Sequence, residues 1–126
     1  MRVFARLIKA LAVAGLGICV MLNAPVTKST AGGIASWYGG GEKLNKHTAS
    51  GEVFDPSDHT CASWDYNFGA ILKVTNTANG KSVVVRVNDR GPHKRLGRVI
   101  DLSKRAFSEI ESLKKGLTIV EIEQVS

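Results

Sequence analysis

Two acidic residues stand where the chain turns, and loops at the ends of strands often present catalytic side chains. Glu52 follows Gly51 in a stretch of small residues, and Asp89 ends the valine-rich run 83–87 just before an Arg-Gly-Pro turn. Two carboxyl groups in one cleft can divide the roles of acid and base. Asp is also a preferred turn residue. The residue types alone therefore leave two interpretations open, a catalytic pair and two solvated loop residues.

A third acidic residue, Asp101, lies among apolar neighbours just before a predicted helix. We expect it to be partly buried and hydrogen-bonded, with a structural role first and contact with substrate as the alternative. His47, His59 and His93 are widely separated and lack the paired spacing of zinc ligands. No metal site is predicted.

Aromatic and sulfur-containing side chains are less specific signals. Trp37 and Tyr38 form one pair near a predicted turn, and Trp64 and Tyr66 form another. For both pairs, core filling and stacking on sugar rings remain open. Cys61 is the one cysteine outside the N-terminal apolar run, so we expect no internal disulfide and a packing role for its thiol.

Short strands with one helix are expected to position these residues. Strands are predicted over Ile34–Tyr38 and around Val120 and Ile122, and an Asn79-Gly80 turn joins runs 70–75 and 82–87 in a hairpin. Apolar residues recur at helical spacing from Ala106 to Leu113, with Ser103 as a plausible N-cap and Gly116 as a stop. Because closure removes exposed sheet edges, this pattern favours a small closed β-barrel.

The first 31 residues have the order of a secretory signal peptide: basic residues, an apolar run from Ala10 to Leu22, and a small-residue cleavage site ending at Ala31. The apolar run is shorter than the roughly 20 residues of a membrane-spanning helix, so no permanent span is expected. Ile18 fits poorly before a lipidated cysteine, so anchoring at Cys19 is the weaker alternative. We expect an exported protein in the periplasm or cell envelope.

Length and charge limit the remaining functions. A chain of 126 residues has room for one domain, expected over residues 32–126, and shows no internal repeat. The formal net charge of +6 falls to near balance when the basic residues of the signal peptide are removed. No nucleic-acid partner is therefore expected, and the domain is expected to be a monomer.

Four ordered motifs together resemble the rare lipoprotein A (RlpA) family. They are GIASWYG at 33–39, TASGEVFD at 48–55, VVVRVNDRGP at 83–92 and IDLS at 100–103. The resemblance implies a mainly β, six-stranded double-psi β-barrel, the fold shared with expansins and barwin-like proteins. It also implies lytic transglycosylase activity on peptidoglycan glycan strands, especially denuded ones, without a cofactor.

The resemblance also implies a set of site residues. Glu52 and Asp89 match the family's essential acidic pair, with Asp89 provisionally the acid/base and Glu52 the stabiliser, although the reverse order stays open. Substrate contacts are expected from Ser63, Asp101, Arg90, Trp37 and Tyr38. Ser63 stands where the family usually has a histidine, which keeps open a non-catalytic, expansin-like glycan-binding or wall-loosening module. The family's SPOR module is not recognised here, so septal targeting is not expected.

Overall fold

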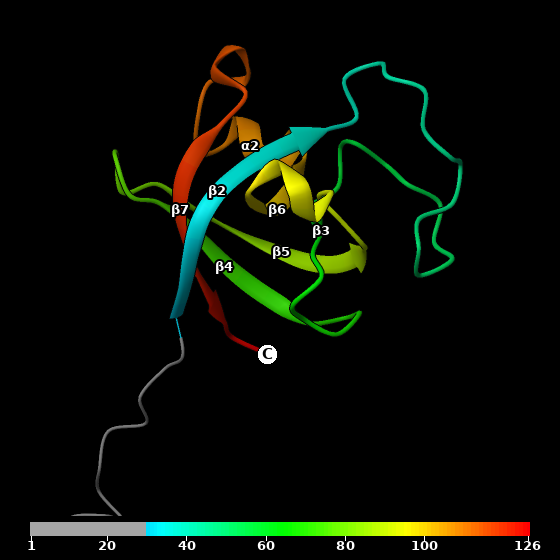
Figure 1. Cartoon of the computed structure of the whole chain (residues 1–126), viewed down its shortest axis with the longest axis horizontal. Coiled ribbons are helices and arrows are strands. Elements are labelled where there is room, and N and C mark those ends of the chain that lie inside the picture. The colour runs from blue at the N-terminus through cyan, green and yellow to red at the C-terminus, as the bar shows by residue number, and fades with distance from the viewer. Residues whose placement is uncertain (1–29) are drawn as a thin grey trace, which may run out of the picture.

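A computed structural model describes residues 30–126, which form a small β-barrel with one short α-helix (Figure 1). The predicted signal peptide lies outside the described residues, except for Thr30 and Ala31. The strands are β2 (Thr30–Tyr38), β3 (Thr60–Ala62), β4 (Ile71–Asn76), β5 (Ser82–Asp89), β6 (Arg98–Ser103) and β7 (Thr118–Gln124). The helix is α2 (Lys104–Ser108), and two 3-10 turns are η1 (Lys94–Leu96) and η2 (Leu113–Lys115).

The six strands close in the order β2-β6-β3-β5-β4-β7, and β7 pairs with β2 to complete the barrel. The pairs β2–β6 and β3–β5 are parallel, and the other four are antiparallel. The predicted closed six-stranded barrel is therefore confirmed. Closure leaves no long open sheet edge in a domain of this size.

The core lies inside the barrel and is filled by alternating strand residues. In β5, Val83, Val85 and Val87 are buried while Val84 is exposed, as expected when successive strand residues point to opposite faces. Leucine and isoleucine from the neighbouring strands and Phe107 from α2 complete the cluster. Cys61 is fully buried within it, and burial raises the pKa of its thiol to about 12. The expected packing role of Cys61 is confirmed.

The local elements predicted from the sequence are present, but the helix is shorter than expected. The hairpin of β4 and β5 turns through Gly80, whose φ of 77° is readily adopted by glycine. The Ser103 hydroxyl oxygen accepts a hydrogen bond from the Ala106 amide at 3.2 Å and caps α2 as predicted. Helix α2 nevertheless ends at Ser108, and Gly116 terminates η2 instead.

Tertiary contacts fix the segment that follows α2. The Ile110 carbonyl, which a continuing helix would offer to the amide of Lys114, accepts side-chain hydrogen bonds from Asn76 at 2.8 Å and Asn79 at 3.0 Å. The Lys114 amide donates to the Ser112 hydroxyl instead. The hairpin therefore anchors the chain at Ile110, two residues beyond the end of α2.

Strands β3 and β6 were not predicted. Strand β3 has only three residues, too few for a visible alternation, and all three are buried. The sequence pattern places Asp101 just before a helix, but residues 98–103 form a strand that pairs in parallel with β2 and antiparallel with β3. Both strands depend on partners far away in the sequence.

Strand β2 begins before the predicted cleavage site. Thr30 and Ala31 pair with Glu123 and Ile122 of β7, so cleavage after Ala31 would remove two paired residues from the barrel. Within residues 30–126, no helix has the length and apolar character needed to cross a membrane.

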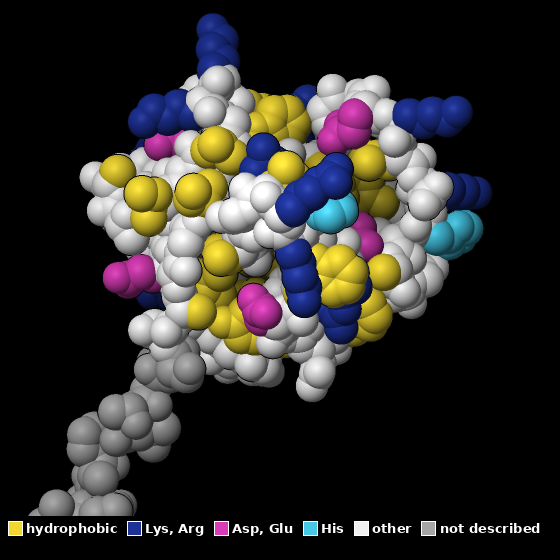
Figure 2. Space-filling view, in the orientation of Figure 1, with side chains coloured by type: hydrophobic (Ala, Val, Ile, Leu, Met, Phe, Trp, Pro, Cys, Tyr) yellow, Lys and Arg dark blue, Asp and Glu magenta, His cyan; other side chains and the backbone are white. Residues whose placement is uncertain are grey.

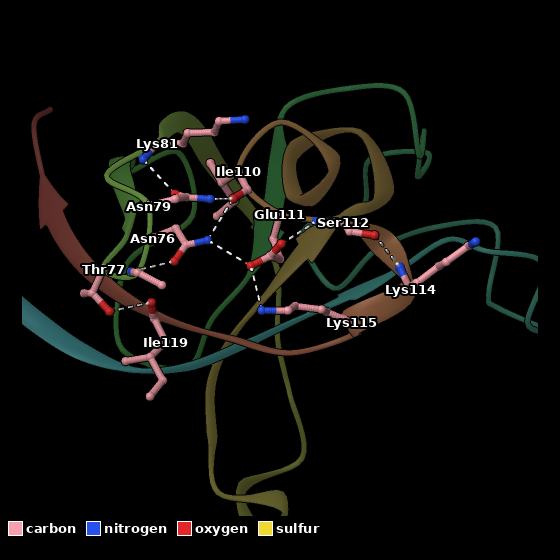
Figure 3. Close-up of polar contacts among 11 residues, drawn as sticks. Asn76, Thr77, Asn79, Lys81, Ile110, Glu111, Ser112, Lys114, Lys115 and Ile119 are labelled. Atoms are coloured by element: carbon pink, nitrogen blue, oxygen red, sulfur yellow. Dashed lines mark hydrogen bonds and ion pairs between the residues drawn. The ribbon is translucent and has the colours of Figure 1, made fainter.

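A polar cluster joins the hairpin turn to the segment after α2 (Figure 3). Asn76 is fully buried, and its amide nitrogen lies 2.8 Å from the Ile110 carbonyl oxygen and 3.3 Å from a Glu111 carboxylate oxygen. Its own carbonyl oxygen accepts from the Ala78 amide at 2.9 Å. Every polar group of this buried side chain therefore has a partner, which makes its removal costly.

We expect Asn76→Ala to lower the free energy of unfolding by about 1–3 kcal/mol, because it removes these hydrogen bonds and opens a small cavity. In a domain of this size, each 1 kcal/mol corresponds to roughly 4–8 °C in Tm. Thermal unfolding followed by circular dichroism measures the effect. Asn79→Ala, which removes one exposed partner of the same carbonyl, is the matched control and should lower the free energy of unfolding by less. Equal Tm values for wild type and Asn76→Ala would contradict the assignment.

Candidate active site at the end of strand β5

Asp89 is the last residue of β5, and its carboxylate is held by three hydrogen bonds from different parts of the chain. The backbone amides of Ala49 and Arg90 each donate to Oδ1 at 2.9 Å. The Tyr38 hydroxyl donates to Oδ2 at 3.3 Å. The carboxylate is thereby oriented by the end of β2, by the loop 44–54 and by its own chain neighbour.

A cavity of about 340 Å³ opens beside this carboxylate. Asp89 and Tyr38 form one side, and the loop 44–54 forms the rest, through Leu44, Asn45, His47, Thr48, Ala49 and Phe54. The Tyr38 ring stacks on Phe54, with centroids 4.6 Å apart. Burial and the neighbouring Asp89 carboxylate raise the pKa of Tyr38 well above its usual value, so its hydroxyl remains a donor.

Backbone hydrogen bonds fold the loop against β5. The Thr48 amide donates to the Glu52 carbonyl at 2.7 Å, and the Gly51 amide donates to the Thr48 carbonyl at 2.9 Å. Gly51 has a φ of 95°, a conformation that glycine adopts without strain. The Ser50 amide then docks the turn on the Asn88 carbonyl at 3.2 Å. Within the TASGE stretch, Gly51 is therefore the residue that this tight turn requires.

Glu52 lies at the same end of β5, but it does not line the cavity. Its carboxylate is bound by the Arg86 guanidinium through two nitrogens, and the Asn88 amide donates to Oε1 at 3.3 Å. The hydrogen bonds from Arg86 and then Asn88 hold the pKa of Glu52 below its ordinary value. The structure thus brings the two predicted acidic residues to one end of the barrel, and of these two only Asp89 lines the cavity.

Asp101 lies in β6 and is closer to Asp89 than the sequence suggested. Ala62 of β3 pairs with Asp101 on one side and with Asp89 on the other, so the two acids occupy the same level of the barrel. Ser36 of β2 is opposite Asp101, and its hydroxyl donates to Oδ1. Burial raises the pKa of Asp101, with a smaller contribution from Asp89, although the Ser36 hydrogen bond opposes the shift. The expected partial burial of Asp101 is confirmed.

Three other predicted contact residues have mainly structural contacts. Trp37 is half-buried against the core and donates its indole N–H to the Leu113 carbonyl at 3.2 Å. Ser63 is 1% exposed, and its hydroxyl oxygen accepts from the Asp65 amide at 3.0 Å. Arg90 donates to the carbonyls of Ser63 and Tyr66. Their predicted contact with substrate stays a prediction.

His47 is a candidate that sequence spacing did not reveal. It is exposed, it lines the Asp89 cavity, and its backbone forms an isolated bridge with Val53 that closes the loop. His59 instead pairs with Glu109 at 2.8 Å. Among the described residues, no group of three or more His, Cys, Asp or Glu side chains could hold a metal ion. Only the fold places His47 beside Asp89.

Comparison with known proteins identifies relatives over nearly all of the barrel. Residues 30–122 match the family described as lytic transglycolase. A probable endolytic peptidoglycan transglycosylase RlpA from a Nostoc species is 50% identical over 92 residues, which is 72% of this chain and 24% of that protein. The Campylobacter jejuni protein of that name is 46% identical over 96 residues, 76% of this chain and 34% of its own length. The chain thus spans less than half of these curated relatives.

Solved structures share the fold at low sequence identity. The Streptomyces papain inhibitor superposes with a TM-score of 0.63 at 22% identity, over 78% of this chain and 96% of its own. A Clavibacter michiganensis expansin in complex with cellohexaose gives a TM-score of 0.62 at 22% identity, over 78% of this chain and 51% of its own. The family match and the identity to these relatives establish that the chain belongs to the RlpA-like lytic transglycolase family.

Proposed function

We propose that this domain is an endolytic peptidoglycan transglycosylase. It would cleave the β-1,4 bond between N-acetylmuramic acid (MurNAc) and N-acetylglucosamine (GlcNAc) in denuded glycan strands and leave a 1,6-anhydroMurNAc end. The observation that carries the proposal is the oriented Asp89 carboxylate at the wall of an open cavity, in a barrel of the lytic transglycolase family. Because this substrate lies outside the cytoplasmic membrane, we propose that the protein is exported and acts there as a monomer.

The reaction needs one group that can move a proton between two oxygens. The C6 hydroxyl of MurNAc attacks C1, the bond from C1 to the GlcNAc O4 breaks, and the proton lost from O6 is delivered to O4. We assign this transfer to Asp89, because it lines the cavity and Tyr38 fixes the orientation of Oδ2. No water nucleophile and no cofactor enter the scheme.

The second carboxylate in the scheme stabilises the positive charge that develops on the sugar ring. Glu52 suits an ionised role, because its ion pair with Arg86 favours the charged form. Its place outside the cavity wall limits it to positioning the loop and to electrostatic stabilisation. Asp101 is a second candidate for the supporting role, since it shares the level of Asp89 through Ala62.

The first prediction from the proposed function concerns the acidic pair. Asp89→Asn should reduce the release of 1,6-anhydroMurNAc ends from purified denuded sacculi by at least about a hundredfold, and Glu52→Gln should also reduce it, because each removes a carboxylate from the scheme. Mass spectrometry of the soluble products measures the release. Glu121→Gln, which changes an exposed carboxylate of β7, should keep the wild-type rate.

The same experiment separates the enzyme from the expansin-like alternative. Wild-type protein that pellets with the sacculi but releases no soluble fragments would favour a glycan-binding or wall-loosening module. Products with reducing MurNAc ends would identify a hydrolase, because water would then have replaced the C6 hydroxyl.

The second prediction uses the buried carboxyl of Asp101. A carboxyl with a raised pKa binds more protons in the folded state than in the unfolded state at pH values between its two pKa values. Stability therefore falls as the pH rises from about 4, the ordinary pKa of Asp, through the folded pKa. Asp101→Asn carries no charge to bury, and its Oδ1 can still accept from Ser36.

We therefore expect Asp101→Asn to unfold at the wild-type temperature or a few degrees above it at neutral pH, to lose this pH dependence, and to lose activity. Thermal unfolding between about pH 3.5 and 8 and the sacculus assay measure the three effects. A variant with a lower Tm and unchanged activity would mean that Asp101 is purely structural.

The third prediction concerns His47. Its imidazole can donate and accept hydrogen bonds at the cavity wall, so His47→Gln should lower the rate by about tenfold, equivalent to roughly one hydrogen bond in the transition state. Tm should not change, because the side chain is exposed. His59→Gln, outside the cavity, is the control. Equal rates for the two variants would exclude a role for His47.

A further inference from the structure

Two exposed aromatic side chains follow the buried strand β3. Trp64 is 48% exposed and Phe68 is 42% exposed. Tyr66, which lies between them in the same loop, packs against the core. Two basic residues from the chain after β5, Arg90 and Lys94, lie against their rings. We call these four residues the aromatic platform. Figure 2 shows hydrophobic side chains interleaved with Lys and Arg over the region of β3 and β5.

The platform is held in place by hydrogen bonds. The Trp64 indole N–H donates to the Pro92 carbonyl at 2.7 Å, which fixes the edge of the ring and leaves the side chain about half exposed. Arg90 donates to the carbonyls of Ser63 at 2.8 Å and Tyr66 at 2.9 Å, which ties down the loop between the two aromatic residues. An exposed indole held in this way is preorganised for a ligand.

The charges of the platform favour an anionic ligand. The guanidinium carbon of Arg90 lies 3.8 Å from the centroid of the Phe68 ring, and Lys94 Nζ lies 5.6 Å from that of Trp64. None of the ion pairs seen in the described part of the chain involves either cation. Arg90 is already engaged with backbone carbonyls, so Lys94 is the cation of the platform that is placed to pair with a ligand. An aromatic face beside this ammonium group suits a ring that also carries a carboxylate.

The platform is connected directly to Asp89. The Ser63 amide, next to Trp64, donates to the Asp89 carbonyl at 3.0 Å, and the Arg90 amide donates to the Asp89 carboxylate. The loop 44–54 attaches to the same stretch of β5 through Ala49 and Ser50. The cavity and the platform are therefore both anchored at Asp89.

We propose that the aromatic platform is a glycan subsite that binds a carboxylate-bearing sugar beside Asp89. Trp64 stacks on the apolar face of the pyranose ring, and Lys94 pairs with the carboxylate. In denuded peptidoglycan that sugar is MurNAc, whose lactyl group carries the charge. This identification of the sugar rests on the proposed function, whereas the stacking itself does not.

Binding is measured by calorimetry with the full domain carrying Asp89→Asn, so that no cleavage occurs. One probe is a soluble oligosaccharide of alternating GlcNAc and MurNAc, and the other is a GlcNAc oligosaccharide of equal length without carboxylates. Trp64→Ala should raise Kd for both probes by at least about tenfold. Lys94→Gln should raise Kd several-fold for the MurNAc probe only. Trp64→Phe should restore much of the binding, because stacking needs a ring.

Matched controls distinguish the subsite from general surface effects. Leu117→Ala changes a side chain that is 44% exposed and lies far from the platform in the sequence. Lys81→Gln changes a cation that follows the hairpin turn. Both should leave Kd unchanged. Since the chain has two tryptophans, a change in fluorescence on binding that disappears in Trp64→Phe assigns the contact to Trp64 over Trp37.

The inference would be overturned if Trp64→Ala, correctly folded by its Tm, bound both probes as tightly as its parent, or if the parent bound neither probe. If binding depends on the platform but the wild type releases no 1,6-anhydroMurNAc ends, the proposed activity is contradicted and the subsite is supported. If Trp64→Ala keeps the wild-type turnover rate and KM, the subsite is contradicted and the proposed activity is supported.

Discussion

The pairing of Ala62 with two acidic partners is the constraint on which the candidate site depends. Strand β3 has only three residues, yet it joins β5 in parallel and β6 in antiparallel fashion, so that Asp89 and Asp101 flank one alanine. Backbone pairing sets this arrangement, and closure of the barrel keeps it rigid. The separation of the two carboxyl groups is therefore a property of the fold and not of any flexible loop.

The loops complete the site by giving each carboxyl group a different environment. Asp89 is held by backbone amides and a tyrosine at the wall of a cavity, while Glu52 is engaged by a guanidinium outside it. Asp101 is partly buried beside a serine, and this burial opposes its ionisation. Different environments of this kind allow carboxyl groups to take different roles in one reaction.

Several segments of the chain supply the side chains around Asp89. Ser63 stands where the resemblance implies a histidine. It is buried, and its hydroxyl oxygen accepts a hydrogen bond from the nearby Asp65 amide. An imidazole nevertheless lines the cavity, and it is that of His47 in the loop 44–54. Trp64, next to Ser63, contributes an exposed ring. The side chains around Asp89 thus come from β2, from the loop 44–54 and from the segment after β3.

The amino-acid sequence by itself determined the features that arise from neighbouring residues: the alternation in β5, the turn at Gly80, the cap at Ser103 and the family motifs that contain Glu52 and Asp89. Only the tertiary structure decided the path of the chain after α2, because the Asn76 side chain at the end of β4 binds the Ile110 carbonyl. It also decided that β3 and β6 are strands, that Glu52 lies outside the cavity and that His47 lies inside it. These features depend on contacts between distant segments, and no local pattern of residue types encodes such contacts.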